Sequence, residues 1–492
     1  MQRLPFGDVD PLSAAIGFMS LLTGIVALLP ALRPRIDAAQ LAERLATAVH
    51  QEEQLALRQL CGAGERDTSI DVQFNHRPAP ARDTQGARRH GQLRDVADYY
   101  QRLRPRRMAI TGAPGAGKTV LALELMMAVL ATRSADDPVP VRLSASTWTA
   151  GGAPLLEPGT GARLMRHWLT THLVEVYKLS RRSARALVAA GRVLPVVDGL
   201  DELDATAQPG YTSRAGQALR VFNDYKAPMI VTCRSEHYDA LSADHTWLHA
   251  SARVEIRPVE PAKAREFIVS RTVHVDRWHT VLDRLVNDPH GPLAAALATP
   301  WRLTLAMAVY ERRPHGTFTR DPQELVAPSL GTVDAVRDHL LGLFIPTVVN
   351  GNPDWPHDPA RVHRWLAVLA GFLHHNATTE RTVGGRRLSS TDIVPHELWP
   401  LAGFRRPRLI ALGCLVPLWL IVAWSTRYAD EGITPSWLAL AASLVTLVHI
   451  GLVRTWTTPW PRPRQLNLSR LGSSRAAVDS CPDAWRVSRS AS

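Results

Sequence analysis

A glycine-rich segment at residues 112–119 has the residue types and the spacing that a phosphate site requires. It matches the pattern GxxxxGK(S/T) in full, with Gly112, Ala113, Pro114, Gly115, Ala116, Gly117, Lys118 and Thr119. Small residues let backbone N–H groups point at phosphate oxygens, the lysine would reach the β- and γ-phosphates, and the threonine hydroxyl would ligate Mg²⁺. Because the chain has only four lysines in 492 residues, a chance match is rare. The segment predicts a nucleotide-binding site.

A second group of candidate residues is acidic and follows the apolar run at residues 193–197. The run ends in Asp198, and a carboxylate presented by a strand beside a phosphate loop orients Mg²⁺. Asp201 and Glu202 follow within one turn, close enough to polarise a water molecule aimed at the γ-phosphate. We therefore predict Asp198 as a metal ligand beside Thr119, and either Asp201 or Glu202 as the general base.

A third candidate is Arg234, which ends the apolar run at residues 229–233. Its guanidinium could meet a γ-phosphate. An arginine at the end of a strand can equally be an ordinary surface residue, and spacing alone leaves both interpretations open.

The flanking sequence predicts the elements that would position these residues. The apolar run that begins at Arg107 suits a buried strand, and the helix formers from Val120 to Ala131 suit a helix, so the glycine-rich loop lies where a strand passes to a helix. A further strand is expected at residues 139–143, and helices are expected at residues 163–177 and 181–190. Strands alternating with helices predict an α/β fold.

The glycine-rich loop, the segment DGLDELD and the segment TCR, in this order and spacing, resemble the NACHT family of signal-transduction NTPases, within the wider STAND group of P-loop ATPases. The small residue Gly199 after Asp198, followed by further acids, marks this resemblance. It covers about residues 94–400. It implies a five-stranded parallel sheet followed by helical and winged-helix regions.

The resemblance also implies roles for individual residues. It implies that Arg234 is the sensor arginine that reads the γ-phosphate, and that Pro300, in the segment Thr299-Pro-Trp, packs against the nucleotide base. A proline at a helix start is by itself more often structural. The family's nucleotide-sensing histidine has four competing candidates, which are His339, His363, His374 and His375.

Three stretches without a charged side chain are long enough to cross a bilayer as helices, at residues 11–32, 409–426 and 432–453. A signal peptide is the alternative for the first stretch, and a buried core hairpin is the alternative for the other two. Arginines flank the stretches on the side that the positive-inside rule assigns to the cytoplasm. We therefore expect three transmembrane helices, a multi-pass location in the cell membrane with the NTPase domain on the cytoplasmic side, and membrane lipid as a partner.

The remaining segments differ in composition. Residues 35–92 predict a helical stalk and a linker, and residues 93–257 hold the nucleotide motifs. Residues 258–400 predict packed helices with a winged-helix region, and residues 455–492 are rich in Ser and Arg, as in a disordered cytoplasmic tail. The predicted fold class is therefore α/β: a P-loop NTPase parallel sheet followed by helical and winged-helix regions, plus three transmembrane helices.

Charge and cysteine content limit the classes of partner and of structural site that the sequence predicts. A net charge of +12 fits a nucleic-acid partner, an anionic membrane surface or an arginine-rich proteome, and we favour the last two, so nucleic acid is not an expected partner. The four cysteines form no CxxC pair, so neither a zinc site nor a disulfide framework is indicated.

Motifs and resemblance together predict a membrane-anchored NACHT-type NTPase that uses ATP/ADP and Mg²⁺ as a switch, in bacterial signalling or defence. The alternatives are a membrane-tethered ATPase that couples hydrolysis to transport or remodelling, and a non-catalytic nucleotide-binding scaffold. A switch would hold ADP tightly and turn over slowly, whereas a motor would turn over briskly. No repeat period and no second catalytic cluster are evident, so either the membrane helices serve as output, or partners supply sensing, or the chain is a shortened version. The expected partners are an unknown protein or ligand activator and, on activation, further copies of the same chain.

Overall fold

A computed structural model of the chain describes residues 37–61, 70–78, 80, 84–148, 159–204, 207–313, 317–351, 357–379, 381–383 and 386–390, together with residues 393, 398, 401, 446 and 450. The chain forms two compact units, Met1–Ala367 and Val368–Ser492. The predicted site residues lie in the first unit, apart from two of the four candidate histidines, His374 and His375.

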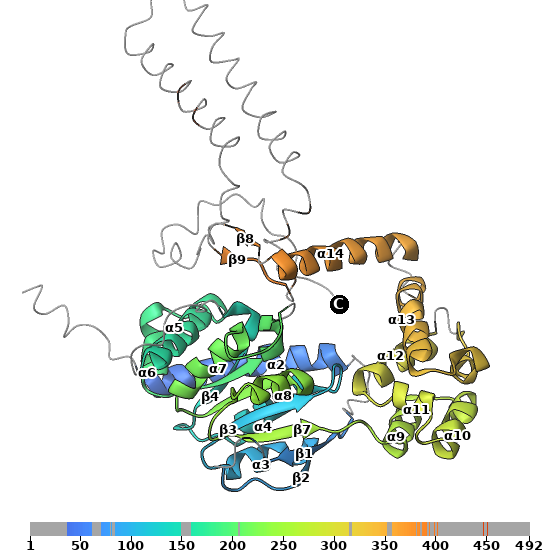
Figure 1. Ribbon diagram of the computed structural model, residues 1–492, viewed down its shortest axis with the longest axis horizontal. Coiled ribbons are helices and arrows are strands. Elements are labelled where there is room, and N and C mark those ends of the chain that lie inside the picture. Colours follow the sequence, from blue (N-terminus) through green and yellow to red (C-terminus); the bar gives the residue numbers. More distant parts are fainter. Residues whose placement is uncertain are drawn as a thin grey trace, which may run out of the picture. The chain divides into compact units, whose positions relative to one another are not determined.

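A seven-stranded mixed sheet is the centre of the first unit (Figure 1). Its strands are β1 (Gln73–Arg77), β2 (His90–Gln92), β3 (Arg107–Gly112), β4 (Val139–Ser144), β5 (Val193–Asp198), β6 (Met229–Arg234) and β7 (Ala252–Ile256), in the spatial order β2-β1-β7-β3-β6-β5-β4. The five strands from β7 to β4 are parallel, the number that the resemblance implies. All six residues of β3 are buried, as expected for the central strand of a parallel sheet that helices cover on both faces.

Two antiparallel strands at one edge make the sheet mixed rather than purely parallel, which corrects the predicted parallel sheet. Strand β1 pairs with β7 and β2 pairs with β1, although composition predicts a linker across residues 62–92. Phe74 is the one apolar residue of β1, and its buried ring packs edge to face on Tyr99 at a centroid distance of 5.2 Å. A strand with a single core residue has no apolar alternation, so the sequence pattern could not reveal it.

Helices cover the sheet and continue beyond it. Those of the sheet region are α2 (Ala38–Cys61), α3 (Val96–Arg102), α4 (Lys118–Thr132), α5 (Thr160–Glu175), α6 (Arg181–Ala189), α7 (Arg214–Asp224) and α8 (Ser235–Ala243). A second group next to the sheet is α9 (Pro261–Arg271), α10 (His279–Asn287), α11 (Pro292–Ala296), α12 (Pro300–Tyr310) and α13 (Val333–Asn350) (Figure 1). Short 3₁₀ turns are η1 (Leu93–Asp95), η2 (Ala145–Thr147), η3 (Leu200–Asp204), η4 (Val275–Trp278), η6 (Pro322–Val326) and η7 (Pro328–Leu330).

Helix α14 (Pro359–Thr379) crosses from the first unit into the second. In the second unit, β8 (Thr382–Val383) pairs antiparallel with β9 (Arg386–Arg387), and the buried Asn376 donates a hydrogen bond to the Ser389 carbonyl at 3.1 Å. The winged-helix assignment within residues 258–400 stays a prediction.

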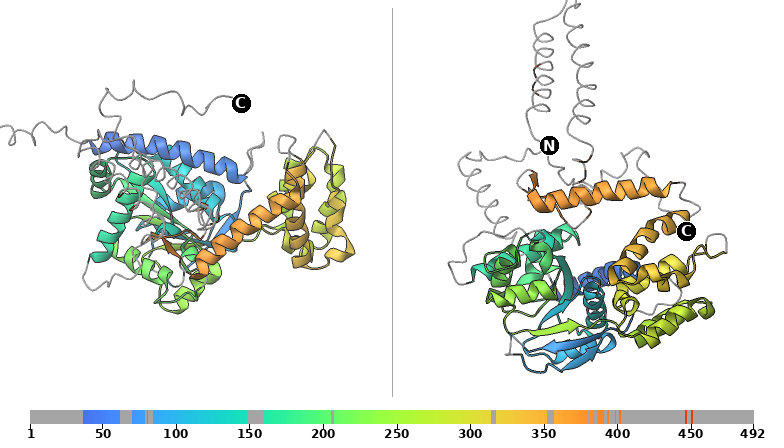
Figure 2. Two further views of the ribbon diagram at one scale, coloured as in Figure 1. Left: turned by 90° about the horizontal axis from the view of Figure 1, so that it is seen from above. Right: turned by 45° about the vertical axis from the view of Figure 1, so that its right-hand side comes forward.

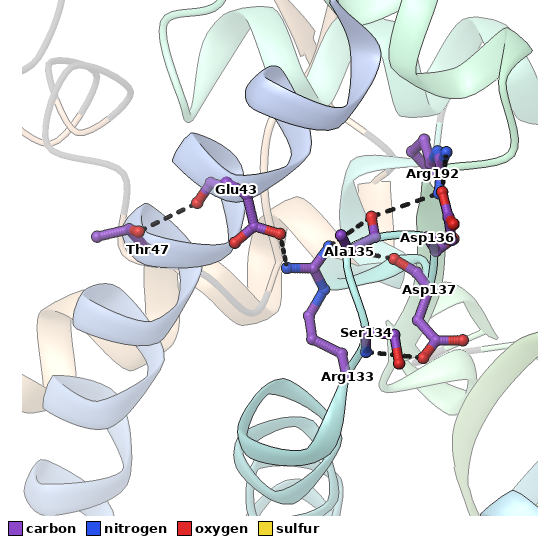
Figure 3. Close-up of polar contacts among 8 residues, drawn as sticks. All are labelled: Glu43, Thr47, Arg133, Ser134, Ala135, Asp136, Asp137 and Arg192. Atoms are coloured by element: carbon purple, nitrogen blue, oxygen red, sulfur yellow. Dashed lines mark hydrogen bonds and ion pairs between the residues drawn. The ribbon is translucent and has the colours of Figure 1, made fainter.

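Helix α2 packs on the nucleotide-motif region, although the sequence predicts a stalk here. Ala42, Leu45 and Val49 lie about one turn apart and are fully buried. Helix α2, drawn in blue in Figure 2, contacts α4, α6 and β4. At the end of α4, the side chain of Arg133 reaches Glu43 on α2, with Nη1 at 2.6 Å from Oε1 (Figure 3). The described part of α2 is therefore one of the layers that cover the sheet.

The predicted membrane-spanning fold needs correction. The three uncharged stretches at residues 11–32, 409–426 and 432–453 lie outside the described residues, apart from Thr446 and Ile450. Among the helices that the structure does describe, none combines the length and the apolar content needed to span a bilayer. The prediction of three transmembrane helices and of a multi-pass membrane location is corrected by this finding. It rested on uncharged length, which measures hydrophobicity but does not show that a helix forms.

Candidate functional site

The glycine-rich loop joins the buried end of β3 to the first turn of α4. Gly115 and Gly117 have positive φ angles of 75° and 94°, a conformation that a side chain would strain. Gly117 is the N-cap of α4, and its carbonyl accepts the first helical hydrogen bond from Leu121 at 2.8 Å. The loop therefore turns its backbone N–H groups and the positive end of α4 toward one point, the arrangement that binds a phosphate.

Lys118 lies across the start of this loop. Its ammonium donates hydrogen bonds to the carbonyl oxygens of Gly112 and Ala113, both at 3.1 Å. Burial lowers the pKa of Lys118, while the nearby carboxylates of Asp201 and Asp198 oppose that effect. Among the described residues, the hydrogen bonds of this partly buried cation go to neutral carbonyls, and it would gain energy from an anionic partner within hydrogen-bond reach. The loop is therefore suited to a phosphate.

Asp198 ends β5 next to the first turn of α4. Its Oδ1 atom accepts hydrogen bonds from the hydroxyls of Thr232, at 2.6 Å, and Thr119, at 3.3 Å. The two predicted Mg²⁺ ligands thus lie side by side and offer the oxygen donors that this cation prefers. Within the described ranges no group of three His, Cys, Asp or Glu side chains gathers to hold a metal. A cation here would complete its coordination with phosphate oxygens and water, which fits Mg²⁺.

The remaining predicted site residues surround the turn after Asp198. Asp201 accepts a hydrogen bond from the backbone N–H of Arg234 at 3.0 Å, and its other oxygen lies 2.8 Å from the Nε atom of the same arginine. Gly199 has a φ of 78°, and a Cβ atom there would lie 2.6 Å from the carboxyl carbon of Glu202. The small residue that marks the family resemblance therefore makes room for the Glu202 carboxylate.

A cavity of about 240 Å³ opens beside the loop. Gly115, Gly117, Lys118 and Thr119 line one side of it, and Pro300, Trp301 and Thr304 of α12 line another. The rest of its lining is Phe267, Arg271 and five apolar residues, which are Leu60, Ile70, Val72, Leu93 and Val120. A largely apolar cavity that continues from a phosphate loop has room for a nucleoside.

Helix α12 contacts the glycine-rich loop directly. The backbone N–H of Trp301 donates to the Gly115 carbonyl at 3.4 Å, and a Cβ atom at Gly117 would lie 3.7 Å from the Pro300 ring. The structure thus brings the predicted Pro300 to the cavity, together with Trp301, which the sequence interpretation did not single out. An aromatic residue directly after Pro300 was the signal in the sequence that could have identified Trp301.

None of the four candidate histidines lines this cavity. His339 instead lies 3.1 Å from the Tyr310 hydroxyl and 3.5 Å from a carboxylate oxygen of Glu324. Thr232 is a further site residue that sequence reasoning missed, although it belongs to the quoted TCR segment. Its role depends on the pairing of β5 with β6, which no linear motif records.

Comparison with known proteins assigns part of the chain to a family. Residues 106–275 match the family described as NACHT domain, a shorter range than the residues 94–400 over which the sequence resemblance extends. No curated protein matches the chain. Among solved structures, one titled "Structure of C. elegans PCH-2" matches with 14% sequence identity and a TM-score of 0.19, covering 49% of this chain and 60% of that chain. Residues 106–275 of this protein are a NACHT domain, and the chain thus contains a STAND-class P-loop NTPase.

Proposed function

We propose that this protein is a nucleotide-driven signalling switch that binds ATP or ADP with Mg²⁺ and hydrolyses ATP slowly. The observation that carries the proposal is the convergence of Lys118, Thr119 and Asp198 on one glycine-rich loop, beside a cavity of nucleoside size. The Asp201–Arg234 pair at the same edge of the sheet supplies a group that can report the γ-phosphate. As in other STAND-class NTPases, the ADP form would be closed and the ATP form open.

Each residue has a role in this proposal. The Lys118 ammonium exchanges two loop carbonyls for the β- and γ-phosphates, and the loop N–H groups bind the same phosphates. Thr119 and Asp198 would hold Mg²⁺, which neutralises phosphate charge when bound. Pro300 and Trp301 of α12 line the cavity, where they would contact the nucleoside. Because α12 touches both the loop and the cavity, the identity of the bound nucleotide can reach the helices that follow the NACHT domain.

The first test is nucleotide binding by the full chain. The Lys118→Ala variant should weaken binding of labelled ADP by roughly 10- to 100-fold, because a charge-assisted contact to phosphate contributes about 1.5–3 kcal/mol. Lys226→Ala is the matched control, since Lys226 is an exposed lysine on the loop between α7 and β6. Equal affinities for the two variants would contradict the site assignment.

The second test separates the switch from an ATPase motor and from a scaffold. We expect the purified protein to carry ADP, to turn over slowly, and to increase in size with a non-hydrolysable ATP analogue but not with ADP. Brisk turnover without a change in size would indicate a motor. Bound nucleotide that never turns over would indicate a scaffold.

A further inference from the structure

A buried ion pair connects helix α2 to the magnesium aspartate. Glu53 of α2 is only 2% exposed. The Nε–H of Arg142 donates to both of its carboxylate oxygens, at 3.2 Å to Oε1 and 3.0 Å to Oε2. Arg142 stands on β4, next to β5 in the sheet, and its Nη1 atom lies 3.9 Å from Oδ2 of Asp198. One guanidinium therefore faces two carboxylates, one on α2 and one at the nucleotide site.

The two oxygens of Asp198 have different surroundings. Thr119 and Thr232 donate to Oδ1, while Arg142 faces Oδ2. Burial lowers the pKa of Arg142, but Glu53 and then Asp198 outweigh it, so that the pKa is raised overall. Arg142 thus interacts with both acids, and among the described residues its guanidinium donates hydrogen bonds to Glu53.

We propose that Arg142 is a positioning residue that sets the Mg²⁺ affinity of Asp198, and that Glu53 of α2 controls it. This inference rests on the proposed function of the site. Glu53 neutralises Arg142 and holds it toward α2, which leaves Asp198 able to attract a cation. When Glu53 is withdrawn, the uncompensated guanidinium repels Mg²⁺ and competes for Oδ2 of Asp198. Movement of α2 would then weaken Mg²⁺ binding, so α2 acts as a regulatory element of the NTPase.

The geometry of α2 suits this role. An ion pair between Glu43 and Arg133 connects its N-terminal half to the end of α4 (Figure 3). Helix α4 begins with Lys118 at the nucleotide site. Glu43 is 56% exposed at its side chain, so that this outer pair contributes little to docking. The buried Glu53 connects α2 to the site electrostatically, because its partner Arg142 also faces Asp198.

The test measures Mg²⁺ dependence in full-length variants. Labelled ADP is bound at increasing Mg²⁺, and Mn²⁺ binding to the ADP complex is followed by electron paramagnetic resonance. Glu53→Gln should raise the half-saturating Mg²⁺ concentration roughly 10-fold, whereas Arg142→Gln should lower it, because the two changes alter the charge near Asp198 in opposite directions. The double variant removes both charges, so its half-saturating Mg²⁺ concentration should be close to that of the unaltered protein.

Two controls separate this role from a structural one. Glu43→Gln removes the other ion pair of α2 and should leave the Mg²⁺ dependence unchanged. Affinity for ADP without metal should be the same in all variants, whereas damage to the fold would lower it. The Arg142→Gln variant leaves Glu53 buried without a cation and for that reason could fail to fold. In that case the Mg²⁺ dependence of Glu53→Gln, compared with that of the double variant, still tests the proposal.

Two outcomes are distinguishable. Absence of ADP binding by the unaltered protein, with or without Mg²⁺, would remove the proposed function itself. Normal Mg²⁺-dependent binding with both single variants shifted in the same direction, or with a double variant that does not recover, would overturn only the role of Glu53 and Arg142.

Discussion

Asp201 and Arg234 are joined through both oxygens of the carboxylate: Oδ1 accepts the backbone N–H of Arg234 at 3.0 Å, and Oδ2 lies 2.8 Å from its guanidinium Nε atom. Asp201 is largely buried and Arg234 is more than half exposed at its side chain. An acid engaged in this way orients the arginine rather than a water molecule. We therefore expect Glu202 to be the general base and Asp201 to hold Arg234 for the γ-phosphate.

Substitution of the two acids should separate these roles. Glu202→Gln should slow ATP hydrolysis by about 100-fold or more and leave ADP affinity unchanged, because only the proton acceptor is lost. Asp201→Asn should lower hydrolysis less, by about 10-fold, and should weaken the preference for ATP over ADP, because Arg234 loses its charged partner. Phosphate release and titration with both nucleotides measure these effects.

Glu236→Gln is the control for this pair. Glu236 is an exposed acid two residues after Arg234, so its neutralisation changes local charge without touching the Asp201 contact. Normal hydrolysis in the Glu202→Gln variant would exclude Glu202 as the general base.

Gly199 offers a test of where the Glu202 carboxylate must lie. An added Cβ would meet the carboxylate of Glu202 at 2.6–3.0 Å, whereas nothing lies within 4 Å of the same position at Gly191. Both glycines have a positive φ, so Gly199→Ala and Gly191→Ala should each destabilise the protein by about 1–2 kcal/mol. Only Gly199→Ala should also slow hydrolysis, since the long Glu202 side chain must move aside.

Thermal unfolding and phosphate release distinguish these effects. Equal hydrolysis by the two alanine variants would show that the placement of the Glu202 carboxylate over Gly199 has no part in catalysis.

The phosphate loop could be predicted from the sequence because its chemistry is local. Backbone amides, two glycines with positive φ and one lysine lie within eight consecutive residues, so spacing alone defines them. Asp198 was predictable for a similar reason, since a strand that ends in a carboxylate is visible in the apolar pattern. Contacts that depend on strand order were not predictable. The pairing of β5 with β6 brings Thr232 to Asp198, and the packing of α2 on β4 brings Glu53 to Arg142.

Two other failures have physical causes. Strand β1 is held by its backbone pairing with β7 and buries few apolar side chains, so that hydrophobic periodicity does not report it. For the transmembrane helices the error was over-prediction, because the length and apolarity of the uncharged stretches were treated as sufficient evidence of a membrane-spanning helix.

Trp301 should contribute directly to nucleotide affinity. It lines the cavity from α12, and its side chain borders Gly115 of the phosphate loop. Trp301→Ala should weaken ADP binding by about 5- to 20-fold, because the aromatic surface that a nucleoside would cover contributes about 1–2 kcal/mol. Its backbone N–H bond to Gly115 is retained in the variant.

Trp365→Ala is a matched control, since Trp365 is 48% exposed and Trp301 is 52% exposed. The control should bind ADP normally in an equilibrium titration. Equal losses in both variants would indicate a general effect of removing a tryptophan and not a contact with the nucleotide.

His172 should make the folded state sensitive to acid. It lies on α5 with its ring 6.0 Å from that of Tyr177, and burial, followed by the charge of Arg142, lowers its pKa to about 4 from a usual value of 6.5. Above pH 6.5 the ring is neutral in both the folded and unfolded states and adds no pH dependence. Between pH 6.5 and 4 the unfolded chain binds a proton that the folded protein does not, so the free energy of unfolding falls, by about 3 kcal/mol in all.

Urea unfolding at pH 7 and at pH 4.5 measures this loss in the unaltered protein and in His172→Gln. Other groups also titrate in this range, so the informative quantity is the difference between the two proteins. The variant should lose about 2–3 kcal/mol less than the unaltered protein between the two pH values, since it has no imidazole to protonate on unfolding. His167→Gln, at an exposed position on the same helix, should behave as the unaltered protein does. An identical loss in His172→Gln would mean that the ring takes up its proton equally well in the folded state, and that His172 is not the source of acid sensitivity.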